Sequence, residues 1–322
     1  MKTDMDMTEL LRRRLADVPA GSVKTEAGEL TATTSGKGLM EIRELFPGIR
    51  LSFNDFLAGG IAFRHPASRS VLEIHYCHRG RVGWDMKNGT SVYLGAGDLA
   101  VHSRDCCADS VMQFPTGFCC GISLSVDLKQ LEVELPPFLA ESGFSLCSLW
   151  EKYCGLHRST AISACGDTEA IFAPLYRAAD PWRLPWMKLK ALELLLFLGQ
   201  YTPDSRLMTP SSSRQADLIR QIHSLLTEDL SRRCTIEELS RRYLINPSSL
   251  KEAFRAVYGL PIAAYMKNYR IRQAMEILRD TDETVGAVAA KMGYESQGKF
   301  ARAFKDIAGV TPTEYRRNVQ RN

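Results

Sequence analysis

Two ten-residue stretches, Leu250-Lys-Glu-Ala-Phe-Arg-Ala-Val-Tyr-Gly259 and Phe300-Ala-Arg-Ala-Phe-Lys-Asp-Ile-Ala-Gly309, align at an offset of 50 residues. In each stretch apolar residues recur three or four positions apart and a glycine closes the run. This pattern is typical of an amphipathic helix that ends at a glycine cap. Tyr265 and Tyr315 match at the same offset. The sequence therefore contains an internal repeat of a helical unit.

A shorter helix precedes each stretch. Thr235-Ile-Glu-Glu238 is a capping box, in which the Thr and Glu side chains satisfy free N–H groups at a helix start. Ser240 and Ala289 occupy equivalent positions, where a small residue lets two helices cross closely. Short helix, turn and second helix form a helix-turn-helix pattern, present twice and joined by a long helix over Pro261–Arg279. From Asp217 onward we expect seven helices.

This region, about Asp217–Arg317, resembles the AraC/XylS family of transcription regulators. The resemblance rests on Phe254-Arg255, Gly259, Tyr265, Arg270, Ala289, Gly293-Tyr294, Phe300, Phe304-Lys305, Gly309, Thr311-Pro312 and Tyr315-Arg316. It implies an all-α, seven-helix, double helix-turn-helix domain that binds double-stranded DNA. It also implies that the second helix of each repeat enters a major groove, and that an activator of this kind contacts RNA polymerase.

The outward faces of these two helices supply the predicted DNA contacts. Glutamate accepts from cytosine, glutamine pairs with adenine and arginine pairs with guanine in the major groove. On this basis we expect base contacts from Ser248, Lys251, Glu252, Gln297 and Arg302. Arg255, Lys299, Lys305, Arg316 and Arg317 are expected to contact phosphate or to support the fold. For each of these residues, a solvated surface charge is the alternative.

Charge is distributed unevenly along the 322 residues. Residues 214–322 hold 19 Lys and Arg against 13 Asp and Glu, whereas residues 1–213 hold 22 against 24. The positive excess of the last third suits a polyanion partner. With 45% hydrophobic and 24% charged residues the composition is that of a globular chain, and the length suits two domains. No signal peptide or membrane span is evident, so we expect a cytoplasmic protein whose nine cysteines are mostly reduced.

The first two thirds of the chain predict a β-rich domain followed by helices. Between Ile49 and Val126 short alternating runs are separated by turn signals such as Asn88-Gly89, which indicates six or so strands in a sandwich or barrel. From Pro136 to Tyr201 the apolar period becomes helical. Gly95-Ala-Gly-Asp98 with His102 is similar to a cupin turn and strand. The overall prediction is an α+β multidomain protein with a tail (1–35), a cupin-like effector-binding and dimerisation domain (36–201), a linker (202–216) and the helix-turn-helix domain (217–322).

A small barrel of this kind can hold one small ligand. Bulky strand residues are the predicted effector contacts, with a plain core role as the alternative: Phe53, Tyr76, Trp84, Tyr93 and Phe118. The segment Ile74-His-Tyr-Cys-His-Arg-Gly80 is also similar to the pyochelin-regulator-like subgroup of the family. We infer no ligand from that similarity.

Metal and redox chemistry are weaker alternatives. His75, Cys77 and His102 could form part of a metal site, but the remaining ligands of a cupin metal motif are not evident, so we expect no metal and no cofactor. Cys106-Cys107 and Cys119-Cys120 suggest a redox switch, with small buried hydrophobes as the favoured interpretation. The sequence contains no Gly-x-Ser-x-Gly motif, no phosphate-binding Gly-rich loop and no His-Glu-x-x-His motif.

Together these features predict a ligand-responsive, sequence-specific transcriptional regulator, activating by family resemblance, and not an enzyme. The alternative is a metal-dependent cupin enzyme or a cysteine redox sensor fused to a DNA-binding domain. A homodimer is expected through the leucine stripe of the helix Pro185–Tyr201, unless that stripe packs on its own domain.

Overall fold

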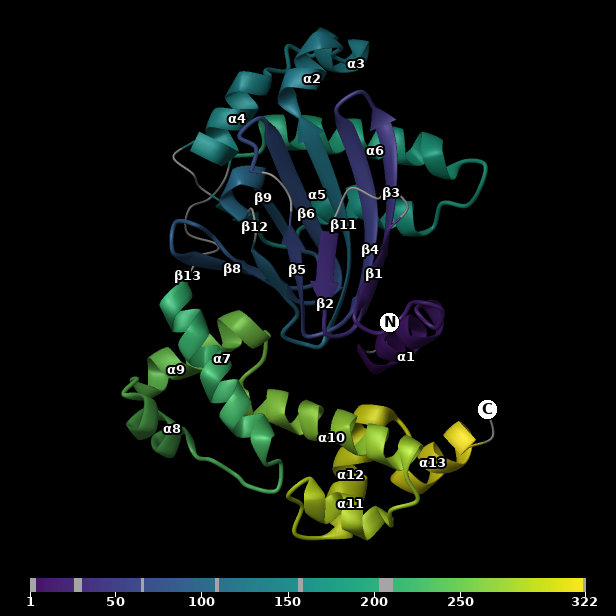
Figure 1. The fold of residues 1–322 in the computed structure, drawn as a ribbon, viewed down its shortest axis with the longest axis vertical. Helices are drawn as coiled ribbons and strands as arrows, with labels where there is room; N and C mark the ends of the chain where they lie inside the picture. Colours follow the sequence, from purple (N-terminus) through teal and green to yellow (C-terminus); the bar gives the residue numbers. More distant parts are fainter. Residues whose placement is uncertain are drawn as a thin grey trace. The chain divides into compact units, whose positions relative to one another are not determined.

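The computed structural model describes residues 4–25, 31–64, 67–107, 110–155, 159–202 and 211–320. It divides into two compact units, Met1–Ser213 and Arg214–Asn322 (Figure 1). We call them the sheet unit and the helical unit. Within the predicted linker over residues 202–216, residues 203–210 lie outside the described part of the chain.

Two sheets face each other in the sheet unit (Figure 1). The seven-stranded sheet has the order β1 (Ser22–Thr25), β3 (Lys37–Phe46), β4 (Ile49–Leu57), β11 (Phe118–Asp127), β6 (Val71–Gly80), β9 (Leu99–Ser103) and β12 (Ser159–Ile162). The six-stranded sheet has the order β13 (Ser211–Ser212), β8 (Thr90–Leu94), β7 (Val82–Asp85), β10 (Val111–Gln113), β5 (Gly60–Arg64) and β2 (Thr31–Thr34). All pairings are antiparallel except that of β1 with β3.

Two expectations are refined by this arrangement. Over the described residues the strands form two open sheets and no closed barrel, so of the predicted sandwich or barrel the sandwich is formed. For residues 1–35 the sequence predicts a weakly ordered tail or one short helix. The structure has that helix, α1 (Asp4–Arg14), and also strands β1 and β2, each paired with a neighbouring strand. Leu11 and Leu15 pack α1 against Phe118, and this contact explains why the helix is held despite its polar composition.

Helices cover the outer face of the seven-stranded sheet (Figure 1). They are α2 (Leu128–Val133), α3 (Pro137–Glu141), α4 (Leu146–Cys154), α5 (Gly166–Phe172), the short η3 (Ala173–Tyr176) and α6 (Arg183–Gln200). A further short helix, η1 (Arg104–Cys107), follows β9. In α6 the side chains of Leu194, Leu195 and Leu198 are fully buried against the sheet, and Leu192 and Leu196 of the predicted dimer stripe pack on the same core. Leu189 alone of those stripe leucines is exposed.

The helical unit contains the seven helices that the sequence predicts: α7 (Ser213–Glu228), α8 (Ile236–Tyr243), α9 (Pro247–Tyr258), α10 (Ile262–Asp280), α11 (Val285–Lys291), α12 (Gln297–Ala308) and α13 (Pro312–Gln320). The capping box is formed, since Thr235 N donates to Glu238 Oε2 (2.8 Å) and Glu238 N donates to Thr235 Oγ1 (3.1 Å). Gly259 and Gly309 end the two repeated helices with φ of 80° and 74°, a conformation that glycine adopts at little cost.

Substitution by alanine is expected to have opposite effects on stability at two glycines of the second repeat. Gly293 has φ +72°, and a Cβ there would lie 2.7–2.8 Å from the carbonyl oxygens of Ser231 and Leu230. Gly298 lies in α12 with open space around a Cβ. We expect Gly293→Ala to destabilise the helical unit by about 1–3 kcal/mol and Gly298→Ala to stabilise it by up to ~1 kcal/mol.

Urea unfolding followed by far-ultraviolet circular dichroism measures both variants. Tryptophan fluorescence reports separately on the sheet unit, because Trp84, Trp150, Trp182 and Trp186 all lie there. Equal stabilities of the two variants would contradict the described backbone at Gly293.

Candidate functional site

The second helix of each repeat, α9 and α12, presents one apolar and one polar face. Leu250, Phe254, Phe300 and Phe304 are completely buried. The opposite faces expose eight of the predicted DNA-contact residues: Ser248, Lys251, Glu252, Arg255, Gln297, Lys299, Arg302 and Lys305. Lys299 pairs with Glu295, 2.6 Å away and also exposed, so that pair is weakly held. Both helices therefore offer a hydrogen-bonding surface of the kind that reads a groove.

Caps and an aromatic cluster hold these helices in place. The side chains of Asn246 and Ser296 accept from the backbone N–H groups of Ser248 (2.9 Å) and Lys299 (3.3 Å), at the start of α9 and α12. Behind α9, His223 stacks on Tyr258 and its Nε2 lies 2.9 Å from Tyr265 Oη. Burial, with a smaller effect of Arg272, lowers the pKa of His223 to about 4. The histidine is therefore neutral at pH 7, and its Nε2 shares a hydrogen bond with the Tyr265 hydroxyl.

Arg316 is a further predicted DNA contact, and two of its N–H donors are used within the fold. Its guanidinium donates to the backbone carbonyl of Leu278 (3.3 Å) and to that of Glu283. Arg270 does the same in the first half, donating to Leu230 O and Arg232 O at 3.0 Å each. These two bonds agree with the fold-support role that the sequence left open for Arg316. The guanidinium has three more N–H donors, so a phosphate contact stays a prediction.

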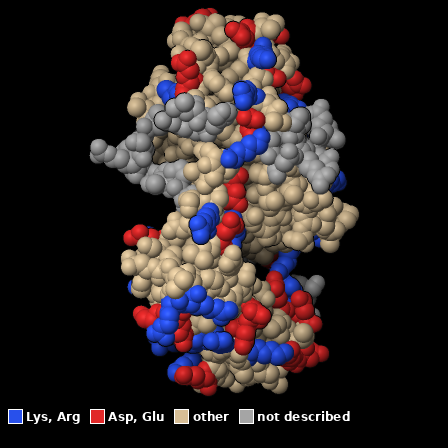
Figure 2. Space-filling view, turned by 60° about the vertical axis from the view of Figure 1, so that its left-hand side comes forward, with Lys and Arg blue, Asp and Glu red and all other residues tan. Residues whose placement is uncertain are grey.

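Basic and acidic side chains alternate over the visible face of the helical unit (Figure 2). The net excess of positive charge is modest, as the sequence counts indicate. A modest net charge gives only weak general attraction to a polyanion.

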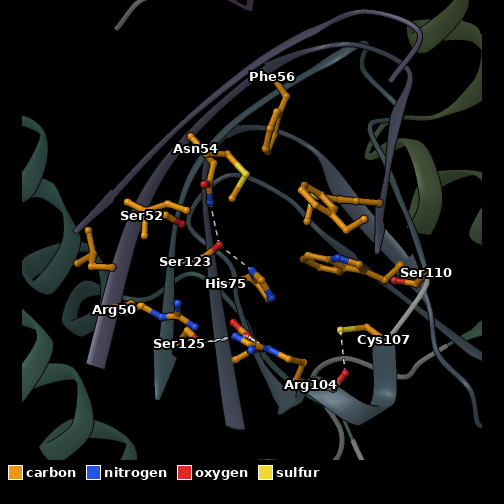
Figure 3. Close-up of a pocket in the computed structure, with 17 residues that line it drawn as sticks. Arg50, Ser52, Asn54, Phe56, His75, Arg104, Cys107, Ser110, Ser123 and Ser125 are labelled. Carbon is orange, nitrogen blue, oxygen red and sulfur yellow. Dashed lines mark hydrogen bonds and ion pairs between the residues drawn. The ribbon is translucent and has the colours of Figure 1, made fainter. Parts of the chain in front are cut away.

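A cavity of about 360 Å³ lies between the two sheets of the sheet unit (Figure 3). This volume is at the lower end of the range for small-molecule sites. The residues that line it are Met40, Ile42, Arg50, Leu51, Ser52, Asn54, Phe56, Phe63, Glu73, His75, Trp84, Arg104, Cys107, Ser110, Met112, Ser123 and Ser125. The seven-stranded sheet supplies most of the polar side chains, whereas Trp84, Phe63 and Met112 of the six-stranded sheet supply an apolar wall.

Two hydrogen-bonded groups organise the polar side of the cavity (Figure 3). Asn54 Nδ2 donates to Ser123 Oγ, and Ser123 Oγ lies 2.8 Å from His75 Nδ1. Asn54 Oδ1 is buried and has no hydrogen-bond partner in the described structure. Arg104 Nη2 lies 2.6 Å from Glu73 Oε1 in a largely buried ion pair, and Ser125 Oγ accepts from the same nitrogen (2.7 Å).

Of the five predicted effector contacts only Trp84 lines this cavity. Phe53 and Tyr76 point to the outer face of the sheet, where they pack on Tyr176 and Phe172 of the helical cover. Phe118 lies against α1. These side chains lie outside this cavity because the helices bury the bulky apolar side chains of the seven-stranded sheet on its outer face.

Tyr93 also lies outside the lining of this cavity. It lies opposite Gly83 in the pairing of β7 with β8, and Gly83 precedes Trp84 along β7. Because successive strand residues point to opposite faces, Tyr93 faces away from the cavity. Phe53 does line a second cavity of about 620 Å³ beside α1, where Arg14 pairs with Asp55 at 2.9 Å.

The weak metal candidates do not assemble into a site. His75 lines the cavity and its ring lies 5.1 Å from that of fully buried His102, but Cys77 Sγ donates to the carbonyls of Arg79 and Gly80. Burial lowers the pKa of His102. Among the described residues no group of three or more His, Cys, Asp or Glu is placed to hold a metal ion.

None of the nine cysteines forms a disulfide bond. Both adjacent pairs, Cys106-Cys107 and Cys119-Cys120, are buried. Burial, with the neighbouring Asp55 carboxyl, raises the pKa of Cys120. Since the thiolate is the reactive form, this position is poorly suited to oxidation.

The sequence did contain a signal for the cavity residues that were missed. Ser52 and Asn54 in β4, and Ser123 and Ser125 in β11, alternate with apolar residues over a regular period of two. Such a period marks one face as polar, and a polar strand face is most often the solvent-exposed one. In the structure that face meets the second sheet instead.

Comparison with known proteins supports the repeat in the helical unit. Residues 239–318 match a family model described as a helix-turn-helix domain. An uncharacterized HTH-type transcriptional regulator, YtdP of Bacillus subtilis, is 33% identical over 100 residues, 31% of this chain and 12% of that protein. The HTH-type transcriptional activator RhaR of Yersinia pestis is 27% identical over 148 residues, 45% of this chain and 50% of that protein. The chain thus spans half or less of the length of these curated relatives.

Among solved structures, the C-terminal domain of AraT, a response regulator from Geobacillus stearothermophilus, is 26% identical and covers 33% of this chain and 88% of its own length, with a TM-score of 0.31. ToxT from Vibrio cholerae is 12% identical, and the match covers 84% of this chain and 98% of ToxT, with a TM-score of 0.32. In the described part of the chain no helix is long and apolar enough to cross a membrane.

Proposed function

We propose that this chain, whose residues 239–318 form a helix-turn-helix domain of the AraC type, is a sequence-specific transcriptional regulator that responds to a small molecule. The domain match and the relatives named as transcriptional regulators support a DNA-binding, non-enzymatic role. The observation that carries the proposal is the pair of capped helices α9 and α12, each anchored by buried phenylalanines and exposing polar side chains.

On DNA, α9 and α12 enter two major-groove segments. Lys251 and Glu252 of α9, and Gln297 and Arg302 of α12, are exposed and long enough to reach base edges. Gly298 and Ala301 bring no hydrogen-bonding side chain, so α12 reads fewer bases than α9. Arg255 and Lys305 lie further along the helices and contact phosphate.

The effector binds in the cavity between the two sheets. This cavity belongs to a cupin-like sensor domain over residues 36–201, which precedes the DNA-binding domain over residues 217–322. A cavity of about 360 Å³ with an apolar wall and a few convergent polar groups is what a small-molecule site requires. Binding shifts the activity on DNA only if the effector's affinity differs between the active and inactive states. An activating outcome, with a contact to RNA polymerase, is supported by the relative named as an activator.

A homodimer forms through the exposed face of α6 rather than through its leucine stripe. Trp182, Trp186 and Leu189 are 66%, 40% and 52% exposed, and their spacing places them on one side of the helix. Trp and Leu side chains so exposed on one face are typical of an interface. We expect Trp186→Glu to convert a dimer into a monomer in sedimentation velocity, while Lys188→Glu, a neighbouring exposed position, leaves the dimer intact. A wild-type chain that sediments as a monomer at micromolar concentration would contradict this interface.

Arg302 gives the most direct test of DNA recognition. Arg302→Ala should weaken binding to the specific site by ~1–3 kcal/mol and relax the preference at one base pair, because a bidentate contact to guanine is lost. Arg279, which pairs with Asp280 at the end of α10, provides a matched control, and Arg279→Ala should leave affinity within about twofold.

The measurement is gel-shift titration on a site selected from random DNA, at one fixed salt concentration. Equal affinity of the Arg302 variant and the wild type for both selected and random DNA would remove Arg302 from the interface.

A further inference from the structure

A long helix and a loop join the two halves of the helical unit (Figure 1). The first half contains α7, α8 and α9, and the second contains α11, α12 and α13. The long helix, α10, is shared between them. Tyr265 near its start packs on Phe254 of α9. Leu278 near its end belongs to the core around Phe300 of α12. One shared helix can act as a hinge, since a bend at a few residues moves everything beyond it.

The second attachment is the loop between α7 and α8, residues 229–235, which we call the bridging loop. In sequence it lies within the first half, yet Leu230 packs on the apolar core of the second half. The carbonyl oxygens of Leu230 and Ser231 lie so close to Gly293 that a Cβ there would be 2.8 and 2.7 Å from them. Gly293 belongs to the turn between α11 and α12. The bridging loop therefore packs directly on the turn that leads into α12.

Arg270 fastens the bridging loop to α10. Its Nε donates to Leu230 O and its Nη2 donates to Arg232 O, at 3.0 Å each. Hydrogen bonds from a charged donor are stronger than those between neutral groups. The two bonds fix two points of the loop on the shared helix.

Arg233 fastens the same loop to the second half. Its Nη2 donates to Gly293 O (3.2 Å), and its guanidinium lies 5.9 Å from the ring centre of Tyr294. A cation at this distance over an aromatic ring is attracted to it. The turn before α12 is thus held by a side chain that the first half supplies.

The bridging loop is also held at both of its own ends. At the start, Asp229 Oδ1 accepts from the backbone N–H (2.9 Å) and the hydroxyl (2.6 Å) of Ser231. At the end, Thr235 forms the capping box of α8 with Glu238. Because α8 packs on α9, the loop transmits a fixed position from the turn before α12 to α9. With α10 it makes a second rigid path between the two helices, and a hinge motion at α10 is blocked.

A blocked hinge has a consequence for DNA. One turn of the duplex is about 34–36 Å long and holds about 10 base pairs, so one inserted base pair shifts the second segment by about 3.5 Å and turns it by about 35°. Two helices that keep one distance and one angle cannot follow this change, and the contacts of one helix are lost. A hinged pair would follow it and keep both sets of contacts.

We propose that the bridging loop, fastened by Arg270 and Arg233, fixes the spacing between the two DNA segments that the chain reads. This inference rests on the proposed function and adds the residues that set the spacing. Both arginines are positioning residues, because they act through the placement of α9 and α12. Arg233 is exposed, so a phosphate contact is its competing role. Loss of a phosphate contact weakens binding at every spacing alike, whereas loss of positioning changes the ratio between spacings.

Gel-shift titration of the full chain on three duplexes measures that ratio. One duplex carries the selected site. The others carry the same site with one base pair inserted or removed midway between the two segments that footprinting protects. For the wild type we expect roughly thirtyfold weaker binding to both altered sites, equivalent to the loss of about one good base contact.

Four variants assign this spacing penalty to residues. Arg270→Met and Arg233→Ala should each lower it to about fivefold or less, because the pair of helices can then follow the DNA. Arg233→Lys, which keeps the charge and one donor, should retain most of the penalty. Arg232→Ala removes the neighbouring exposed arginine but leaves the carbonyl that Arg270 uses, so it is the control and should keep the full penalty.

Melting followed by circular dichroism shows which variants are folded. Because Arg233 is exposed, Arg233→Ala is expected to fold even if Arg270→Met does not. An unchanged penalty in each folded variant, or a wild type that binds all three duplexes equally, would overturn the inference. If the wild type meanwhile binds its selected site and Arg302→Ala weakens that binding, the proposed function stands and the role of the bridging loop alone is wrong.

Discussion

Alternation of side chains along the strands of the seven-stranded sheet is the constraint on which the sheet unit depends. Its odd and even positions cannot share a face, so the apolar set, with Ile74, Ile122 and Leu124, must be covered on one side. Helices α2 to α6 provide that cover. The complementary set, with Asn54, His75 and Ser123, is then forced toward the second sheet, where it becomes the polar wall of a cavity. The cavity thus follows from the same alternation that builds the core.

The helical unit uses the helical period in the same way. One face of α9 and of α12 carries phenylalanines that are completely buried, and the other face is exposed and can contact a partner. The supporting groups are duplicated in the two halves. Arg270 and Arg316 each donate two hydrogen bonds to backbone carbonyls, and an N-cap side chain opens each recognition helix. Two similarly built halves are what a protein needs to meet two turns of one DNA duplex.

Much of this could be predicted from the sequence, and the failures have a common cause. The seven helices, the capping box and the glycine ends follow from local patterns, because each depends on residues within a few positions of one another. The residues that line the cavity did not follow. Choosing between the two faces of a strand requires knowing which face the helices cover, and that is set by residues far away, such as Leu194 and Leu198 of α6. Strands β1 and β2 were missed for a similar reason, because these short polar strands gain stability from pairing with β3 and β5.

The central claim is that both recognition helices engage DNA at once. Hydroxyl-radical footprinting of the full chain on a selected site tests it most directly. If both helices are engaged, each bound chain protects two segments about 10 base pairs apart, one turn of the duplex. A single protected segment, unchanged when Gln297 and Arg302 are both replaced by alanine, would contradict it, since only the first repeat would then be in contact with DNA.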